Sequence, residues 1–316
     1  MTHTNKNMVS LVIPVYNEEQ NLKELNKRIL AVFDSMDTDY EIIYVDDGSS
    51  DKSLDIIKQF CNGSEFIHFI SFYRNFGQHA GVLAGLKHAR GDIIMTLDAD
   101  LQNPPEEIPK FVDEMNNGYD IVAGRRIERQ DDIRRKIPSY FVNKFISKLT
   151  GVKFNDYGCM MRAYNRNIVK QLVNYGEKSL YITAFGSWLS DNSKEIPIKH
   201  EPRFMGKTKY SLFKLFRQLF DLITAYTIAP IQIIGIIGLI FFGLGIVLFI
   251  YLMYFRVFVG HINPLTSFIA LLILFSGLIL FSIGVISEYI VRIYKEVKKM
   301  PLYLIRNSSI QSINDE

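Results

Sequence analysis

The chain has 316 residues and a formal net charge of +3, with 36 Lys or Arg against 33 Asp or Glu. This length suffices for one sizeable α/β domain and a smaller part, and so small a charge does not indicate a nucleic acid partner. The two cysteines are too few for a disulfide framework and are consistent with a reducing compartment.

Strand and helix patterns alternate over residues 9–124. Apolar runs predict strands at Val9–Tyr16, Glu41–Asp46, Phe66–Phe72, Asp92–Leu97 and Tyr119–Gly124. The segments between them predict helices at Glu18–Asp34, Asp51–Cys61, Gly77–Arg90 and Pro105–Asn116. This alternation is typical of an α/β fold, in which helices cover both faces of a mostly parallel sheet.

Polar clusters follow three of the predicted strands: Tyr16-Asn17-Glu18, Asp46-Asp47-Gly48-Ser49 and Asp98-Ala99-Asp100. Because ligands of such sheets bind outside the carboxyl ends of the strands, we expect the three clusters to meet at one edge. Carboxylates of the second cluster can accept hydrogen bonds from a nucleobase or from ribose hydroxyls, although an ordinary capped turn also explains that loop.

The stretch Asp98-Ala99-Asp100-Leu101-Gln102 carries the strongest chemical signal. Alternate residues of an extended segment point the same way, so Asp98, Asp100 and Gln102 would share one face. Three oxygen-bearing side chains suit a hard divalent cation that keeps positions open for a phosphate. An isolated Asp-x-Asp is more often a solvated acidic turn, but the preceding strand and the other two clusters favour the metal site.

Downstream of residue 124 the chemistry becomes basic. Gly124-Arg125-Arg126, together with Arg129, Arg134, Arg135 and Lys136, forms a cluster that suits a lipid phosphate, or else a solvated start of a helix. Helices are predicted at Arg134–Leu149 and Ile168–Val173, and a strand at Ile196–Phe204. Arg203–Tyr210 combines cations with a glycine, and it could close over a diphosphate or anchor the next helix to anionic lipid.

The C-terminal third indicates a membrane. Tyr210–Tyr226 is amphipathic and fits a membrane interface, with a soluble packing helix as the alternative. Ala229–Phe255 and Leu265–Ser287 contain no charged residue and each exceed the roughly 20 residues that span a bilayer. Basic residues flank this hairpin on both outer sides, which places both termini in the cytoplasm. The N-terminus has no apolar signal-peptide core, and the tail after Asn307 is expected to be disordered.

These patterns predict four segments: a catalytic domain over residues 1–205, an interfacial helix over 206–228, a membrane hairpin over 229–290 and a cytoplasmic tail over 291–316. The strands, the Asp98 stretch and the motifs Ile13-Pro14-Val15-Tyr16-Asn17-Glu18 and Val45-Asp46-Asp47-Gly48-Ser49 resemble the family 2 glycosyltransferases of GT-A fold. Within that family the chain resembles the polyprenyl-phosphate glycosyltransferases, which include dolichol-phosphate mannose synthase. Residues 74–79, 96–110 and 156–164 are similar to the bacterial undecaprenyl-phosphate 4-deoxy-4-formamido-L-arabinose transferases.

The resemblance implies roles for particular residues. Asp98, Asp100 and Gln102 would hold Mg²⁺ or Mn²⁺ against the diphosphate of a nucleotide-sugar. Pro14, Tyr16, Glu18 and Asp46 would form the uridine pocket, and Arg203 and Lys209 would close on the diphosphate. Arg126, Arg135 and Ser139 match positions that grip the acceptor phosphate, and Asp156 matches the proposed catalytic acid–base position, with Asp100 as the second catalytic residue. Residues 124–129 differ from the sequence expected of the aminoarabinose enzymes, so the sugar stays open.

The expected activity is inverting transfer of a sugar, from a UDP-sugar, to undecaprenyl phosphate at the cytoplasmic face of a bacterial inner membrane. The lipid-linked sugar would then serve modification of lipid A, O-antigen or another envelope glycan. The resemblance also implies a homo-oligomer, such as a tetramer. The alternatives are a glycosyltransferase with a different lipid acceptor and a catalytically silent nucleotide-binding membrane scaffold.

Overall fold

The computed structural model describes residues 7–127, 154, 156, 158–176, 186, 189–201 and 301–310, with separate positions between residues 254 and 297. The chain divides into two compact units, one formed by Met1–Ser211 with Pro301–Glu316 and the other by Leu212–Met300. The predicted helices at Arg134–Leu149 and Tyr210–Tyr226 lie outside the described residues, as does most of the predicted membrane hairpin.

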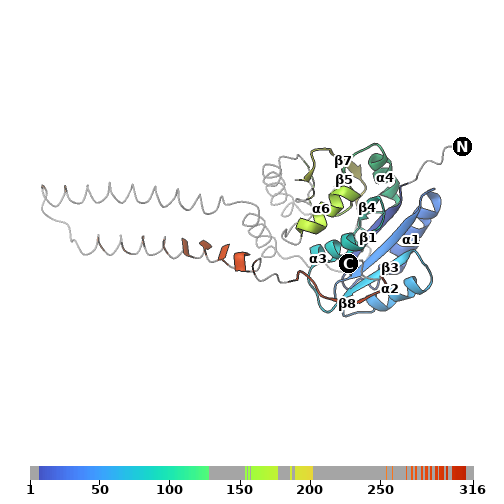
Figure 1. Cartoon of the computed structure of the whole chain (residues 1–316), viewed down its shortest axis with the longest axis horizontal. Coiled ribbons are helices and arrows are strands. Elements are labelled where there is room, and N and C mark those ends of the chain that lie inside the picture. Colours follow the sequence, from blue (N-terminus) through green and yellow to red (C-terminus); the bar gives the residue numbers. More distant parts are fainter. Residues whose placement is uncertain are drawn as a thin grey trace. The chain divides into compact units, whose positions relative to one another are not determined.

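An eight-stranded sheet forms the centre of the first unit, in the order β7-β5-β6-β4-β1-β2-β3-β8 (Figure 1). The strands are β1 Val9–Val15, β2 Tyr40–Asp46, β3 Ile67–Phe72, β4 Ile93–Thr96, β5 Ile121–Arg126, β6 Arg162–Asn165, β7 Ser193–Ile198 and β8 Ile305–Ser308. Strands β1 to β5 and β7 run in one direction, whereas β6 and β8 run antiparallel to their neighbours. The prediction of an α/β fold with a mostly parallel sheet is therefore confirmed.

Helices pack against both faces of the sheet. They are α1 Leu22–Ser35, α2 Ser53–Asn62, α3 Gln78–His88, the short 3-10 helix η1 Pro105–Glu107, α4 Ile108–Asn116 and α6 Arg166–Gly176. Alternate residues of β1 enter two separate cores: one contains side chains of α1, α2 and α4, and the other contains those of α3 and α6. Because β1 is buried on both faces, all seven of its residues are buried, which is why it appears in the sequence as an apolar run.

Helix α3 lies unusually close to the central strand. A Cβ added to Gly85 would come within 2.2 Å of Cγ1 of Val12 on β1, a distance that no unstrained contact allows. The glycine therefore lets the helix backbone approach the sheet. This contact fixes the position of α3, whose first residue is Gln78 at the carboxyl edge of the sheet.

Two strands were not predicted. Strand β6 pairs antiparallel with both β4 and β5, in a stretch for which the sequence predicted no strand. Strand β8 pairs antiparallel with β3, and Tyr303 stacks on Phe72 of β3 with the ring centroids 4.9 Å apart. The predicted strand Ile196–Phe204 begins earlier than expected, at Ser193.

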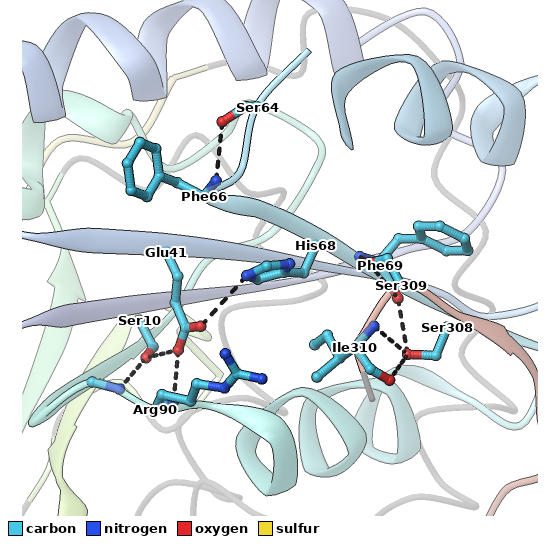
Figure 2. Close-up of polar contacts among 11 residues, drawn as sticks. Ser10, Glu41, Ser64, Phe66, His68, Phe69, Arg90, Ser308, Ser309 and Ile310 are labelled. Atoms are coloured by element: carbon cyan, nitrogen blue, oxygen red, sulfur yellow. Dashed lines mark hydrogen bonds and ion pairs between the residues drawn. The ribbon is translucent and has the colours of Figure 1, made fainter. Parts of the chain in front are cut away.

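The structure describes residues 308–310, so the expectation of disorder was wrong for this part of the tail. Figure 2 shows their attachment to β3: the Ser309 hydroxyl accepts a hydrogen bond from the N–H of Phe69 at 2.8 Å. The Ser308 hydroxyl accepts one from the N–H of Ile310 at 3.0 Å. Ile310 is buried with only 6% of its surface exposed, and burial of this apolar side chain offsets the entropy lost by ordering the segment.

A buried polar cluster joins the amino-terminal ends of the first strands, opposite the predicted site (Figure 2). The Glu41 carboxylate accepts hydrogen bonds from the Ser10 hydroxyl at 2.5 Å and from the N–H of Arg90 at 2.6 Å, and it lies 3.9 Å from Nε2 of His68. The Ser10 hydroxyl in turn accepts from the N–H of Gly91 at 2.7 Å. These bonds connect β1, β2, β3 and the turn before β4, so the cluster is structural.

Candidate functional site at the carboxyl edge of the sheet

The polar clusters after β4, β1 and β2 meet at one edge, because these parallel strands are neighbours in the sheet. The loops after β1 and β2 are bonded together. The N–H of Asn17 donates to the Ser49 hydroxyl at 3.0 Å, and the side-chain oxygen of Asn17 accepts from the N–H of Ser50 at 2.8 Å. The convergence that was expected from the sequence is therefore observed.

The residues predicted for a uridine pocket all lie at this edge, but they differ in exposure. Tyr16 is 39% exposed, and Glu18 is half-buried and accepts a hydrogen bond from the side-chain amide of Asn21 at 2.5 Å. Pro14 is buried within β1, facing Gly81 of α3. Tyr16 and Glu18 are thus better placed than Pro14 to contact a ligand directly.

Asp46 is buried at the end of β2, with 1% of its surface exposed. One carboxylate oxygen accepts from the N–H of Ser49 at 3.1 Å, and the other from the Ser71 hydroxyl at 3.1 Å. Its oxygens are therefore engaged with the protein in this structure. A ligand that binds Asp46 would share or replace these hydrogen bonds.

Asp47 holds the start of helix α3 from the neighbouring loop. Its carboxylate accepts hydrogen bonds from the N–H of Phe76 at 2.7 Å and of Gly77 at 2.9 Å. Burial raises the pKa of Asp47 to about 6, an effect that outweighs the two N–H groups, which lower it. The adjacent Gly48 has φ +66, and a Cβ there would lie 2.4 Å from the backbone of Arg74, so the two loops are in close contact.

Asp98, Asp100 and Gln102 are half-buried, whereas the intervening Ala99 and Leu101 are buried. The alternation was predicted, but the reason given for it was wrong. Strand β4 ends at Thr96, and the stretch is a turn in which Leu101 has φ 61. A left-handed conformation is strained for a bulky residue, and such strain is often found at functional sites.

Two further contacts shape this turn. The N–H of Gln102 donates to Oδ1 of Asp100 at 3.2 Å, and the side-chain amide of Gln78 donates to Oδ1 of Asp98 at 2.5 Å. Within the described part of the chain, no group of three or more His, Cys, Asp or Glu side chains is arranged to hold a metal ion. The donor set here has two carboxylates and one amide oxygen, which fits Mg²⁺ or Mn²⁺ if phosphate and water supply the other ligands.

Arg126, the last residue of β5, forms a bidentate ion pair with Asp156. Nε of Arg126 lies 2.7 Å from Oδ2 of Asp156, and one terminal nitrogen lies 2.9 Å from Oδ1. The N–H of Asp156 donates to the Glu195 carboxylate on β7 at 2.9 Å. Asp156 is 3% exposed, so the pair that the sequence assigned to two separate roles forms a single, largely buried unit.

An ion-pair network connects the turn to the end of the described segment before residue 202. Arg28 of α1 contacts the carboxylates of Glu106 at 2.6 Å and Glu201 at 3.3 Å, and the N–H of Glu201 donates to the carbonyl oxygen of Gln102 at 2.9 Å. Glu201 is thus held beside Gln102, two positions before Arg203 in the sequence. Arg203, Lys209, Arg135 and Ser139 lie outside the described residues.

The sequence did not predict several contacts at this edge. They are made by Gln78, Asp47, Glu195 and Arg28. A signal existed for Gln78, because it follows a glycine at the start of a predicted helix on the functional edge. The ion pairs of Arg28 and the contact of Glu195 join residues far apart in the chain, and no local pattern indicates them.

The chain belongs to the family described as glycosyl transferase family 2, which it matches over residues 10–173. It is 42% identical over 302 residues to an undecaprenyl-phosphate 4-deoxy-4-formamido-L-arabinose transferase of Photorhabdus laumondii, covering 94% of this chain and 93% of that one. It is 40% identical to the protein of the same name from Shewanella sediminis, covering 96% and 93%. The family and the near-complete overlap confirm the resemblance seen in the sequence.

A solved structure supports the fold. The crystal structure of glucosyl-3-phosphoglycerate synthase from Mycobacterium tuberculosis, in complex with Mn²⁺, uridine diphosphate and phosphoglyceric acid, matches with a TM-score of 0.50. The sequence identity is 15%, and the match covers 69% of this chain and 77% of that chain. At this identity the similarity shows a shared GT-A-like α/β fold.

Proposed function

We propose that the protein is an inverting glycosyltransferase that moves a sugar from a UDP-sugar to undecaprenyl phosphate at a bacterial cytoplasmic membrane. The observation that carries this proposal is the similarity over 94% or more of the chain to relatives named for transfer to undecaprenyl phosphate. The arrangement of the sheet edge supports it, because the Asp98 turn would bind the donor diphosphate and Arg126, paired with Asp156, would bind the acceptor phosphate.

The reaction would join a phosphate oxygen of the acceptor to the anomeric carbon of the sugar and break the bond from that carbon to the nucleotide diphosphate. A divalent ion bound to Asp98, Asp100 and Gln102 would neutralise charge on the departing diphosphate. Arg203 and Lys209 would add positive charge to the same group. The structure of the M. tuberculosis neighbour with Mn²⁺ and uridine diphosphate supports the choice of metal and nucleotide.

The acceptor needs little help with deprotonation. A phosphate monoester has a second pKa of about 6, so it is largely ionised at neutral pH. Asp156 would therefore act mainly by holding the Arg126 guanidinium in the orientation that binds the acceptor phosphate. The bidentate geometry of the pair supports this role, since it fixes the plane of the guanidinium. Arg135 and Ser139 would complete the acceptor site.

A membrane hairpin would hold the lipid acceptor at the membrane surface. Among the described residues, no helix combines the length and the apolar character that crossing a bilayer requires. The charge-free runs at residues 229–255 and 265–287 nevertheless support a hairpin. The described helical positions within and after the second run add support, since large apolar side chains such as Phe268, Ile279 and Ile290 are 63%, 57% and 58% exposed.

The proposal is tested by incubating membranes that contain the protein with undecaprenyl phosphate and a set of radiolabelled nucleotide-sugars, with and without EDTA. We expect a labelled glycolipid with at least one UDP-sugar, its loss with EDTA, and its recovery when Mg²⁺ or Mn²⁺ is restored. Membranes that contain the Asp100→Asn variant are the control. Nucleotide binding without product from any sugar would instead identify a silent scaffold, and product only with another lipid would identify a different acceptor.

A further inference from the structure

We propose that Gln78 is a positioning residue that holds the Asp98 carboxylate in the orientation required for binding of the metal and nucleotide. This inference rests on the proposed function and adds a residue that neither the motif nor the family resemblance assigns. Its basis is the hydrogen bond from the Gln78 side-chain amide to Oδ1 of Asp98 at 2.5 Å.

The chemistry of the two groups determines the direction of this bond. An ionised carboxylate only accepts hydrogen bonds, so the amide of Gln78 must present its NH₂ group to Asp98. Hydrogen bonds to charged groups are roughly twice as strong as neutral ones. Both side chains are half-buried, which reduces competition from water. The bond therefore restricts rotation of the carboxylate about its last torsion angle.

Gln78 itself is held by the loop that precedes it. It is the first residue of α3, directly after Gly77, whose φ of 99 is accessible to few other residues. Asp47 accepts hydrogen bonds from the N–H groups of Phe76 and Gly77, and Gly48 packs directly against the backbone of this loop at Arg74. The helix behind it is seated on β1 through Gly85.

These contacts connect the two halves of the donor site. The last residue of β2 is Asp46, and Asp47 follows it in the loop. The turn after β4 carries Asp98, and Gln78 of α3 contacts this carboxylate. A residue that orients a metal ligand commonly changes metal affinity about 10- to 100-fold when it is removed. We therefore expect the affinity for metal to depend on Gln78, even though Gln78 is not a metal ligand.

The test measures Mn²⁺ binding to the purified full chain in the presence of UDP by electron paramagnetic resonance, without any turnover. Gln78→Leu removes the amide and approximately keeps the side-chain size, and we expect it to raise the apparent dissociation constant of Mn²⁺ about 10-fold or more. Gln78→Glu places a second carboxylate against Asp98 and should raise it further. Gln78→Asn keeps the amide on a shorter stem and should recover part of the affinity.

Two controls separate positioning from a general structural effect. Gln59→Leu changes an exposed glutamine on α2 and should leave the Mn²⁺ constant unchanged. In an Asp98→Asn background, Gln78→Leu should change the Mn²⁺ dissociation constant little, because Gln78 affects metal binding only through the Asp98 carboxylate. In the glycosyltransfer assay, Gln78→Leu should raise the metal concentration required, whereas kcat at saturating Mn²⁺ should stay within about threefold of the wild type.

An unchanged Mn²⁺ constant in Gln78→Leu would overturn the inference, as would equal effects in the wild-type and Asp98→Asn backgrounds. A wild-type chain that binds no Mn²⁺ with UDP would overturn it as well. Failure of the proposed function is a different result: Mn²⁺ binding depends on Gln78, but no glycolipid is formed from any UDP-sugar.

Discussion

At the scale of single residues, the pairing of Arg126 with Asp156 changes the interpretation of both. The sequence assigned the arginine to the acceptor phosphate and the aspartate to acid–base chemistry. The structure joins them through two short contacts and attaches Asp156 to Glu195 through its backbone. A carboxylate with these partners is better suited to orient a guanidinium than to remove a proton. The acceptor phosphate is already largely ionised at neutral pH, so no residue has to deprotonate it.

We therefore expect Asp156→Asn to be less harmful than Asp100→Asn. Loss of the charged partner should lower kcat/KM about 10-fold, mainly through KM for undecaprenyl phosphate, because one hydrogen-bonded charge pair is lost. Loss of Asp100 should cost about 100-fold or more, because it removes a ligand of the charge-stabilising metal. Steady-state kinetics with both substrates varied would measure this. Equal loss in the two variants, with both still folded, would contradict the ranking.

The raised pKa of Asp47 predicts that the stability of the protein depends on pH. Its pKa in the folded protein is about 6, above the ordinary 3.8, so the folded state binds the proton more tightly than the unfolded state does. Its contribution to stability is therefore full below the unfolded value and is lost as pH rises through the folded value. The loss should be on the order of 2 to 3 kcal/mol, since one pKa unit corresponds to about 1.4 kcal/mol.

Asp47→Asn removes this titration. The difference in Tm, variant minus wild type, should become more positive as pH is raised from about 4 to about 7. Weaker hydrogen bonds to Phe76 and Gly77 would lower the Tm of the variant by the same amount at every pH. Only the change of the Tm difference with pH therefore reports the titration of the carboxyl group. Asp113→Asn, at an exposed position on α4, is the matched control. A flat difference across this range would contradict the assignment.

At the scale of elements, the packing of α3 against β1 at Gly85 is the contact at which we expect a substitution to change stability most. An alanine in a helix is normally about 1 kcal/mol more favourable than glycine. Gly85→Ala should instead destabilise the protein by about 1 to 3 kcal/mol, because the new methyl group would overlap Val12. Thermal unfolding of the full chain measures the effect.

The same helix offers a graded comparison. At Gly81 an added Cβ would lie 3.3 Å from Cβ of Pro14, so Gly81→Ala should cost less than Gly85→Ala. Combining Gly85→Ala with Val12→Ala should restore part of the lost stability, since the second change makes room for the first. A Gly85→Ala protein with a raised Tm would show that helix propensity outweighs the packing described here.

The elements that the sequence predicted well are those whose burial produces a local pattern. Strands β1 to β5 lie inside the sheet and are apolar over several residues, so their positions could be predicted from the sequence. Strands β6 and β8 have no apolar run and contain polar residues such as Arg162 and Asn307. Their conformation is set by pairing with β4, β5 and β3, which are distant in the sequence.

The candidate site divides in the same way. Asp98, Asp100 and Gln102 follow a recognisable strand, so their place at the carboxyl edge of the sheet could be predicted. The partners Gln78 and Arg126 lie 20 and 30 residues from the carboxylates they contact, and only the fold brings them together. The turn at Leu101 was also missed, because nothing in its sequence marks a left-handed conformation.

At the scale of the whole molecule, the unit that holds the candidate site is formed by two separate parts of the chain, Met1–Ser211 and Pro301–Glu316. The last described residues return to the sheet as β8 and bury Ile310, although residues 212–300 form a separate unit between them and the rest. The chain thus enters and leaves that second unit from one folded domain.

The most direct test of the account uses the purified full chain, undecaprenyl phosphate and the UDP-sugar that supports transfer in membranes. Mass spectrometry and NMR of the lipid product report which sugar is attached and with what anomeric configuration. We predict a sugar linked to the lipid phosphate with inverted configuration, formed only with a divalent metal and not by Asp100→Asn. A product with retained configuration, or equal product from the Asp100→Asn variant, would contradict the account.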